Sequence, residues 1–352
     1  MTPASRLHVA RWHGCFSSLM SVPSRVPAAT GDAEFRRVRQ LVAVSDGDPL
    51  APFALRPEKS YAFAPDGGAA VGYRVRLGCA VAAGDPVGMP KSWEAAIEAF
   101  LAEARRRRLR VAVLGAGERA KPIWSSHGLA SVPIGRDVVV DRAKFTLSGR
   151  RFRNLRQAVQ RSRNAGVTVE FRREGELTQS EVQQLRALMR RSHRVDSRGF
   201  SMILGRLFDG RSPDAVLALA RDAHGSVVAA HRYLWAGQHD LSLDLPIRAP
   251  EAPNGVDERL IAETVEWGDG HGVERISLAF APFPELFVNR GHLGALGRLA
   301  YAAVHLLDPL ISVERLYRYL RKFHAFDQER YVMLRWHQVP VVAAAALLLE
   351  FF

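Results

Sequence analysis

Two strand-like runs near the start of the chain decide its fold class: Val71-Gly72-Tyr73-Arg74-Val75-Arg76 and Cys79-Ala80-Val81. A third run, Tyr61-Ala62-Phe63, precedes them, and Pro65-Asp66-Gly67-Gly68 stands between as a turn. Short runs rich in aromatic and β-branched residues, separated by glycine-containing turns, are typical of antiparallel strands. The segment therefore predicts an antiparallel meander.

A helix and another strand follow this meander. The turn Gly84-Asp85-Pro86-Val87-Gly88 leads to Ser92, which can cap a helix. In the next residues one apolar face recurs at helical spacing, and its members are Trp93, Ile97, Phe100, Leu101 and Ala104. A strand is then expected from Val111 to Leu114.

The second half of the chain repeats this order with other residues. Strands are expected at Val227 to Trp235 and at Leu241 to Leu245, a helix near Asp257 to Trp267, and a strand at Arg275 to Phe280. The recurrence of meander, loop, helix and strand predicts a duplicated α/β unit.

The connector between the halves predicts two helices. A basic helix is expected around Arg151 to Asn164, and a second is opened by Thr178-Gln179-Ser180-Glu181, which has the spacing of a capping box. We therefore expect four segments: a poorly ordered tail at 1–45, a first unit at 46–145, a basic helical connector at 146–200 and a second unit at 201–352.

The composition of the 352 residues, 47% hydrophobic and 24% charged, is that of a globular protein and excludes wholesale disorder. Arginine carries almost all of the net charge of +13, because the lysines are Lys59, Lys91, Lys121, Lys144 and Lys322 alone. Guanidinium groups suit the phosphates of tRNA, nucleotides or anionic lipids. A GC-rich coding sequence is the alternative explanation for most single arginines.

Cysteine content and hydropathy limit the other classes. Cys15 and Cys79 are too few for a disulfide framework or a thiolate metal site, so we expect a reducing compartment and no bound metal. The first 31 residues lack the apolar core of a secretory signal. The most apolar stretches, Leu296 to Leu307 and Val339 to Leu349, are shorter than the ~20 residues that cross a bilayer. Each predicts a buried helix, with contact at a membrane interface as the alternative.

Seven stretches, in one order between residues 46 and 352, resemble the C-terminal catalytic domain of bacterial phosphatidylglycerol lysyltransferases, especially the actinobacterial branch. They are Phe53-Ala54-Leu55-Arg56-Pro57-Glu58-Lys59-Ser60-Tyr61, Gly84-Asp85-Pro86-Val87-Gly88, Gly199-Phe200-Ser201-Met202, Ser242-Leu243-Asp244-Leu245, Ala252-Pro253-Asn254-Gly255-Val256, Ser277-Leu278-Ala279-Phe280-Ala281, and Lys322-Phe323 with Arg330-Tyr331.

This resemblance implies an α/β fold of two fused acetyltransferase-like units, with mixed antiparallel and parallel sheets flanked by helices. It implies transfer of an aminoacyl group, lysyl or other, from aminoacyl-tRNA to a glycerol hydroxyl of phosphatidylglycerol. Family members often carry an N-terminal membrane flippase, which is not seen in this sequence. We therefore expect a cytoplasmic protein, peripheral at the inner face of the cell membrane.

The sequence also departs from the family pattern. Ile247 occupies the position of an arginine that follows Ser-Leu-Asp-Leu-Met in the family, and Arg248 comes one residue later. Ala325 and Asp327 stand where proline and tryptophan are common, and Ala279 replaces a usual asparagine or glycine.

Near the end of a predicted strand, Asp244 and Arg248 offer a carboxylate and a guanidinium at one edge of a site. Asp244 can accept a hydroxyl proton or bind the α-ammonium of the donor, and Arg248 can contact phosphate. The alternative is a pair that only holds the loop. Asn254, in the turn before the next helix, can receive an anion or oxyanion, or serve as a plain turn residue. That loop lacks a glycine cradle, so no coenzyme A and no other cofactor is expected.

Lys322 joins Asp244 and Arg248 as a candidate catalytic residue, and Asn254, Arg330 and His193 are the candidates for substrate binding. Lys322 is one of few lysines, which favours a role in phosphate or ester binding over a surface ion pair, and Arg330 follows it beyond a predicted helix end. His193 marks another helix exit and can shuttle a proton or be an exposed helix-end residue.

A basic segment lies between Arg142 and Arg163. It holds eight basic residues and no acidic one: Arg142, Lys144, Arg150, Arg151, Arg153, Arg156, Arg161 and Arg163. On a helix, Phe152, Leu155 and Val159 share an inward face that leaves Arg153, Arg156 and Arg163 outside. This surface suits a tRNA backbone or an anionic bilayer, with a solvated basic helix as the alternative.

The resulting hypothesis is aminoacyl transfer from aminoacyl-tRNA to phosphatidylglycerol, which raises the positive charge of the membrane surface. One alternative is aminoacyl-tRNA-dependent N-acyl transfer to a peptide or small amine. The other, motivated by Ile247, Ala325 and Asp327, is a catalytically silent module that binds lipid or tRNA.

Overall fold

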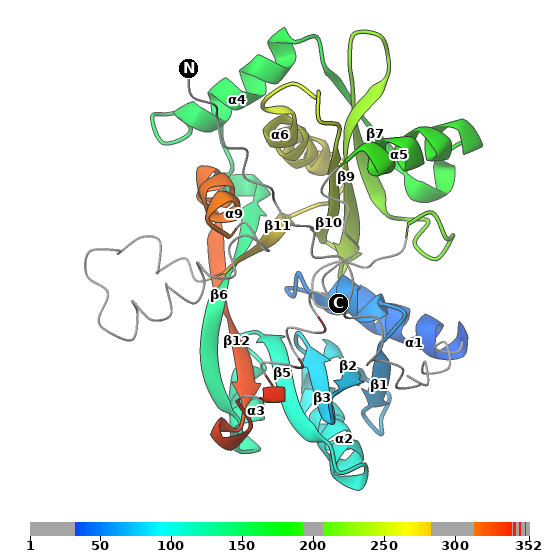
Figure 1. The fold of residues 1–352 in the computed structure, drawn as a ribbon, viewed down its shortest axis with the longest axis vertical. Helices are drawn as coiled ribbons and strands as arrows, with labels where there is room; N and C mark the ends of the chain where they lie inside the picture. Colours follow the sequence, from blue (N-terminus) through cyan, green and yellow to red (C-terminus); the bar gives the residue numbers. More distant parts are fainter. Residues whose placement is uncertain are drawn as a thin grey trace, which may run out of the picture.

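The computed structural model describes residues 32–192, 207–282 and 313–339, with 341–342, 345 and 349. In these residues twelve strands form one mixed sheet, in the order β1-β2-β3-β5-β12-β6-β11-β10-β9-β8-β7, with β4 beside β2 (Figure 1). The strands are β1 (Ser60–Phe63), β2 (Ala69–Arg76), β3 (Cys79–Ala83), β4 (Val87–Gly88), β5 (Arg110–Ala116), β6 (Ala130–Asp141), β7 (Thr168–Arg173), β8 (Val216–Arg221), β9 (Val227–Ala236), β10 (Asp240–Arg248), β11 (Arg275–Pro282) and β12 (Phe326–Leu334).

Helices flank this sheet. The α-helices are α1 (Asp32–Ala43), α2 (Trp93–Arg106), α3 (Lys121–Ser126), α4 (Arg153–Asn164), α5 (Gln179–Arg191), α6 (Val256–Asp269) and α9 (Val313–Leu320). Short 3₁₀ helices are η1 (Ala51–Leu55), η2 (Pro90–Ser92), η3 (Arg142–Lys144), η4 (Glu174–Glu176), η6 (Arg321–Phe323) and η7 (Trp336–Gln338). A mixed sheet flanked by helices confirms the predicted α/β fold class.

The order of elements occurs twice, as predicted. In each half an antiparallel pair leads into a helix and a parallel neighbour: β2 and β3 lead through α2 to β5, and β9 and β10 lead through α6 to β11. The last strands are exchanged between the halves, because β12 pairs with β5 of the first half and β6 pairs with β11 of the second. Strands β12 and β6 also pair with each other, which makes the sheet continuous.

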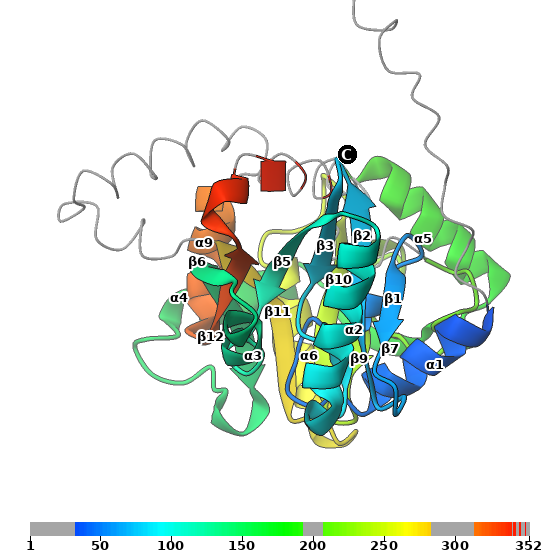
Figure 2. The ribbon, with the colours of Figure 1, turned by 90° about the horizontal axis from the view of Figure 1, so that it is seen from below.

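Buried hydrophobic cores hold the layers together. The apolar face predicted for α2 is buried against β1, β2 and β5 (Figure 2). In the second half, α6 and α5 lie on opposite sides of β9 (Figure 1). Another core joins the halves, because α1 and η1 pack against Ala215 and Leu234 of the second half.

Local details differ from the sequence predictions at three places. Residues 32–43 form helix α1, inside the segment 1–45 expected to be poorly ordered. Strand β7 lies within the connector that was expected to be helical. Ser92 is at the N-cap position of α2, but its hydroxyl donates to Asp66 at 2.6 Å instead of capping the helix. The boundaries at 145 and 200 stay a prediction.

The two apolar stretches have different outcomes. Leu296 to Leu307 lies outside the described residues. In the second stretch Val342, Ala345 and Leu349 are buried against β3, β5 and β12, as expected of a helix that packs inward. Among the helices that the structure describes, none has the length and hydropathy needed to cross a membrane.

Candidate functional site

Strands β10 and β11 separate at the carboxyl end of their short parallel ladder. The ladder joins Asp240 with Arg275 at one end and stops at Ser242 with Ser277. Beyond it, β10 continues beside β9 alone and β11 beside β6, and an irregularity in β10 places Asp244 between paired residues. Ligands of α/β proteins bind where strands part in this way, outside their carboxyl ends. This end of β10, with the start of α6, is the candidate site.

Asp244 is buried against an arginine that the sequence reading did not select. Arg232 on β9 donates from Nη1 to Asp244 Oδ2 at 2.5 Å and from Nε to Glu174 Oε2 at 2.6 Å. All three side chains are buried, and Glu174 Oε1 also accepts the Phe208 N–H. Burial opposes the charge of Arg232, but the carboxylates of Asp244 and Glu174 raise the pKa of its guanidinium above the ordinary value.

Arg248 belongs to a second polar group, around the first turn of α6. Its Nη1 donates to Asp257 Oδ2 at 3.3 Å, and its Nη2 donates to the carbonyl oxygens of Ala252 and Pro253 at 2.9 and 3.4 Å. The other oxygen of Asp257 lies 3.2 Å from Nε2 of His231, which is buried on β9. Arg248 therefore holds the loop between β10 and α6.

Asp244 and Arg248 do not form the single site edge that the sequence suggested. His231 and Arg232 are consecutive on β9, so their side chains project to opposite faces of the sheet. His231 shares Asp257 with Arg248 on the α6 face, whereas Arg232 binds Asp244 on the other face. The irregularity in β10 changes which face Asp244 uses, and local spacing cannot reveal this.

Asn254 and Gly255 are held by packing around the start of α6. The Asn254 side chain lies 3.5 Å from Arg248 Nη2, so it contacts the same loop network. Gly255 has φ +93°, and a Cβ there would come within 2.0 Å of the Ala158 carbonyl oxygen of α4. The Pro-Asn-Gly turn therefore allows α4 and α6 to pack closely.

Lys322 lies at the same helix start. Its Nζ is 2.7 Å from Glu258 Oε1 in the first turn of α6, and it also lies over the Tyr319 ring. The Glu258 side chain is 9% exposed and that of Lys322 is 36% exposed. Lys322, Arg248 and Asn254 thus gather around one helix terminus, and Lys322 keeps an accessible cation there.

Arg330 is enclosed by carboxylates at the corresponding end of β3 and β5. On β12, it donates from Nε to Asp137 Oδ2 and from Nη2 to Asp48 Oδ1, both at 2.7 Å, and from Nη1 to the Gly115 carbonyl oxygen. Asp85, from the Gly-Asp-Pro-Val-Gly turn, accepts the Gly117 N–H at 2.7 Å. These contacts join β12 to β5 and β6, and the substrate role expected for Arg330 stays a prediction.

Burial of this cluster changes the protonation of two carboxyl groups. Desolvation and the neighbouring charge of Asp48 raise the pKa of Asp85 from 3.8 to about 7, against the attraction of Arg330. Desolvation likewise raises the pKa of Asp137 to about 6, despite its bond to Arg330. One arginine does not compensate three carboxylates removed from water.

The basic segment forms helix α4, with Leu155 and Val159 buried and Arg153, Arg156 and Arg163 exposed, as predicted. Its charges are more engaged than the sequence indicated. Arg163 pairs with Glu263 at 3.3 Å, and Arg156 donates to the carbonyl oxygens of residues 147 and 149. Arg142 and Lys144 pair with Asp269 and Asp141.

Other sequence expectations are resolved in part. His193 lies outside the described residues. Ile247, in place of the family arginine, is buried in the core, so this position carries no cation. The sequence reading missed His231 and Arg232, although two polar residues inside the apolar run of β9 were a usable signal.

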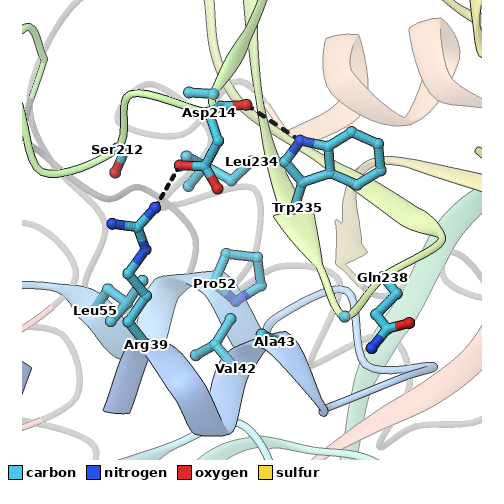
Figure 3. Close-up of a pocket in the computed structure, with 12 residues that line it drawn as sticks. Arg39, Val42, Ala43, Pro52, Leu55, Ser212, Asp214, Leu234, Trp235 and Gln238 are labelled. Carbon is cyan, nitrogen blue, oxygen red and sulfur yellow. Dashed lines mark hydrogen bonds and ion pairs between the residues drawn. The ribbon is translucent and has the colours of Figure 1, made fainter. Parts of the chain in front are cut away.

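A cavity of about 370 Å³ lies elsewhere, between α1, η1 and the β9–β10 turn (Figure 3). Val42, Pro52 and Leu234 give it apolar walls, and the Arg39–Asp214 ion pair at 2.8 Å closes one side. Among the residues that the structure describes, none of the predicted site residues lines this cavity. It is therefore separate from the polar groups at β10 and α6.

Comparison with known proteins agrees with this architecture. The structure superimposes on L-PGS from Bacillus licheniformis with a TM-score of 0.74 at 19% identity, covering 92% of this chain and 98% of that one. The C-terminal domain of a putative lysylphosphatidylglycerol synthetase from Agrobacterium fabrum gives a TM-score of 0.75 at 20% identity, covering 90% and 97% of the two chains. At these identities the likeness concerns the fold.

Sequence relatives are nearer. The chain is 46% identical over 324 residues to the MprF-like domain protein Rv1619 of Mycobacterium tuberculosis, covering 90% of this chain and 66% of that protein. It is 37% identical to the lysylphosphatidylglycerol biosynthesis bifunctional protein LysX of Mycobacterium ulcerans, covering 92% of this chain and 30% of LysX. The model of the family described as phosphatidylglycerol lysyltransferase, C-terminal, matches residues 39–334. The chain therefore belongs to the family of phosphatidylglycerol lysyltransferase C-terminal domains.

Proposed function

We propose that this chain transfers an aminoacyl group from aminoacyl-tRNA to a glycerol hydroxyl of phosphatidylglycerol at the inner face of the cell membrane. The observation that carries the proposal is the family match across residues 39–334, together with relatives whose names state lysylphosphatidylglycerol biosynthesis. The chain spans about a third of those relatives, so the activity of this chain alone is part of the proposal.

The chemistry is the exchange of one ester for another. The glycerol hydroxyl attacks the carbonyl carbon of the aminoacyl ester, the bond to the tRNA ribose breaks, and the hydroxyl proton ends on the ribose oxygen. Asp244, at the point where β10 and β11 part, is the group that takes the proton and returns it. Lys322, which pairs with Glu258 at the start of α6 and is 36% exposed, is the cation that we assign to a phosphate of the substrate.

The transfer assay separates this proposal from its rivals. The purified chain is incubated with radiolabelled lysyl-tRNA and phosphatidylglycerol vesicles, and the lipids are separated by thin-layer chromatography. We expect a labelled aminoacyl-lipid that disappears in Asp244→Asn. Label on an added peptide or amine, with none in lipid, contradicts lipid transfer, and tight binding of both substrates without any product supports a silent module.

The tRNA is expected to bind along α4. Removal of one arginine that binds a phosphate should lower the salt dependence of tRNA binding by about one counterion. Arg153→Ala/Arg163→Ala tests this surface without disturbing the loop that Arg156 holds. A matched control is Arg105→Ala/Arg106→Ala on α2, whose side chains are also exposed. Equal affinity and equal salt slope for both double variants would make α4 a solvated basic helix.

A further inference from the structure

Arg232 has one polar atom that no hydrogen bond explains. Its side chain is 1% exposed, and Nε and Nη1 are bound by Glu174 and Asp244. Its Nη2 is buried and has no hydrogen-bond partner in the part of the chain that the structure describes. The two carboxylates use one oxygen each on this guanidinium, so they stand on either side of the unpaired group.

An unpaired donor of this kind is costly. A buried N–H without an acceptor loses its hydration and costs about 1–3 kcal/mol, and more for a charged group. Native proteins satisfy nearly all such atoms, and the exceptions call for a bound water, an ion or a functional role. This donor lies beside Asp244, near the point where β10 leaves β11, so a ligand atom is a candidate for its acceptor.

The chemistry of the three side chains defines which ligand group fits. The atom that meets Nη2 must accept a hydrogen bond, which excludes an ammonium group. With both carboxylates ionised, Arg232, Asp244 and Glu174 sum to one negative charge, which disfavours a phosphate. A hydroxyl fits both demands, because its oxygen accepts from Nη2 while its proton is donated to a carboxylate.

We propose that Arg232 Nη2 holds the acceptor hydroxyl of the substrate alcohol and directs its proton to Asp244. This inference rests on the proposed function and adds a residue that contacts the attacking group. As the hydroxyl oxygen bonds to the ester carbonyl carbon, its proton passes to Asp244, and Asp244 returns it to the departing ribose oxygen. Glu174 then acts as a positioning residue, since it holds Arg232 by Nε.

Kinetics of Arg232→Met and Arg232→Lys test the contact. A misplaced nucleophile costs about 100-fold in rate, so we expect that loss in Arg232→Met, with part of the activity restored in Arg232→Lys and with the KM for aminoacyl-tRNA unchanged. The acid limb of the pH–rate profile should move to higher pH, because carboxylates without their cation hold protons more tightly. The control is Arg259→Met, which removes a partly buried arginine bound to Glu263 on α6.

The result that overturns the inference is a folded Arg232→Met protein whose transfer rate lies within about threefold of that of Arg259→Met. A change confined to the KM for aminoacyl-tRNA also overturns it, since the contact would then be to the donor. Circular dichroism and melting curves identify a variant that does not fold. If Arg232→Met does not fold, lipid binding to the wild-type protein tests the inference instead.

Binding to the wild-type protein gives a readout independent of turnover. The ¹⁵N signals of the Arg232 guanidinium are followed while dihexanoyl-phosphatidylglycerol or dihexanoyl-phosphatidylmethanol, which lacks the headgroup hydroxyls, is added. A shift with the first lipid alone supports the inference, even if no aminoacyl-lipid is formed and the proposed function fails. Equal responses to both lipids, or no response because a water occupies the position, overturn it even if transfer occurs.

Discussion

Asp85→Asn should change how the stability of this protein depends on pH. Asp85 is buried beside Asp48, Asp137 and Arg330, and its pKa is raised from 3.8 to about 7. Between about pH 4 and pH 7 the folded protein keeps a proton that the unfolded chain has released. The stability that this proton provides is complete below about pH 4 and is lost as the pH rises through 7.

The size of this effect on the free energy of unfolding follows from the difference between the pKa of Asp85 in the folded and in the unfolded protein. A carboxyl group with a pKa of 3.8 unfolded and about 7 folded lowers the free energy of unfolding by about 2–3 kcal/mol between pH 5 and pH 8. Asparagine cannot ionise, and its side-chain oxygen can still accept the Gly117 N–H. The free energy of unfolding of Asp85→Asn minus that of wild type should therefore increase by about 2–3 kcal/mol from pH 5 to pH 8.

The assay is urea unfolding at pH 5, 6.5 and 8, followed by both circular dichroism and tryptophan fluorescence, because a chain of 352 residues must first be shown to unfold in one transition. Asp137→Asn should give a smaller gain that is complete nearer pH 6. Asp214→Asn, on an exposed carboxylate, is the matched control. A difference between Asp85→Asn and wild type that does not vary with pH would refute the reasoning.

Other substitutions separate packing from binding. Gly255→Ala should lower the free energy of unfolding by more than about 3 kcal/mol, because its Cβ meets the Ala158 carbonyl oxygen, whereas Gly149→Ala, with open space at φ +79°, should cost about 1–2 kcal/mol. Thermal melts of the two variants give the comparison, and equal losses would contradict the close approach. Lys322→Met should lower the melting temperature, because it leaves the nearly buried Glu258 carboxylate without its cation, and should reduce transfer by the folded variant about 10- to 100-fold if Lys322 binds phosphate. Unchanged transfer would assign Lys322 to the ion pair alone.

Features that depend on residues close together in the sequence were predicted well. The capping box of α5 forms as expected, with Thr178 accepting the Glu181 N–H at 3.2 Å and the Glu181 carboxylate accepting the Thr178 N–H at 2.8 Å. Helix α4 ends at Asn164, and Gly166 follows with φ +72°. These motifs involve neighbours within four residues, so the chain itself carries their partners.

The exchange of the last strands between the two halves could not be predicted from local sequence. Strand β12 enters the sheet between β5 and β6, whose residues lie about 200 positions earlier in the chain. The hydrophobic pattern of a strand tells which face is buried but does not name the strand beside it. The sequence therefore predicted two units, and the pairing that joins them required coordinates.

The candidate site was predicted only in part, because the partners of its residues also lie far away in the sequence. Asp244 was selected from its place at a strand end and Lys322 from the scarcity of lysine, but their partners Arg232 and Glu258 are 12 and 64 residues away. The sequence around a carboxylate at a strand end is the same whether that carboxylate faces substrate or a buried arginine. The sequence signal that remained was a charged residue inside the apolar run of β9, because such a residue is buried only when it is paired.

The exchanged strands also make the two halves depend on each other chemically. Arg330 lies on β12, near the end of the second half, yet its partners Asp48, Asp85 and Asp137 all belong to the first half. Without β12, three buried carboxylates would face each other and the edges of β5 and β6 would lose their ladder. The first half is therefore completed by the second, while β6 supplies the second half with the neighbour of β11. A site built where β10 and β11 part is thus braced by strands from both halves, which fixes its geometry across the whole sheet.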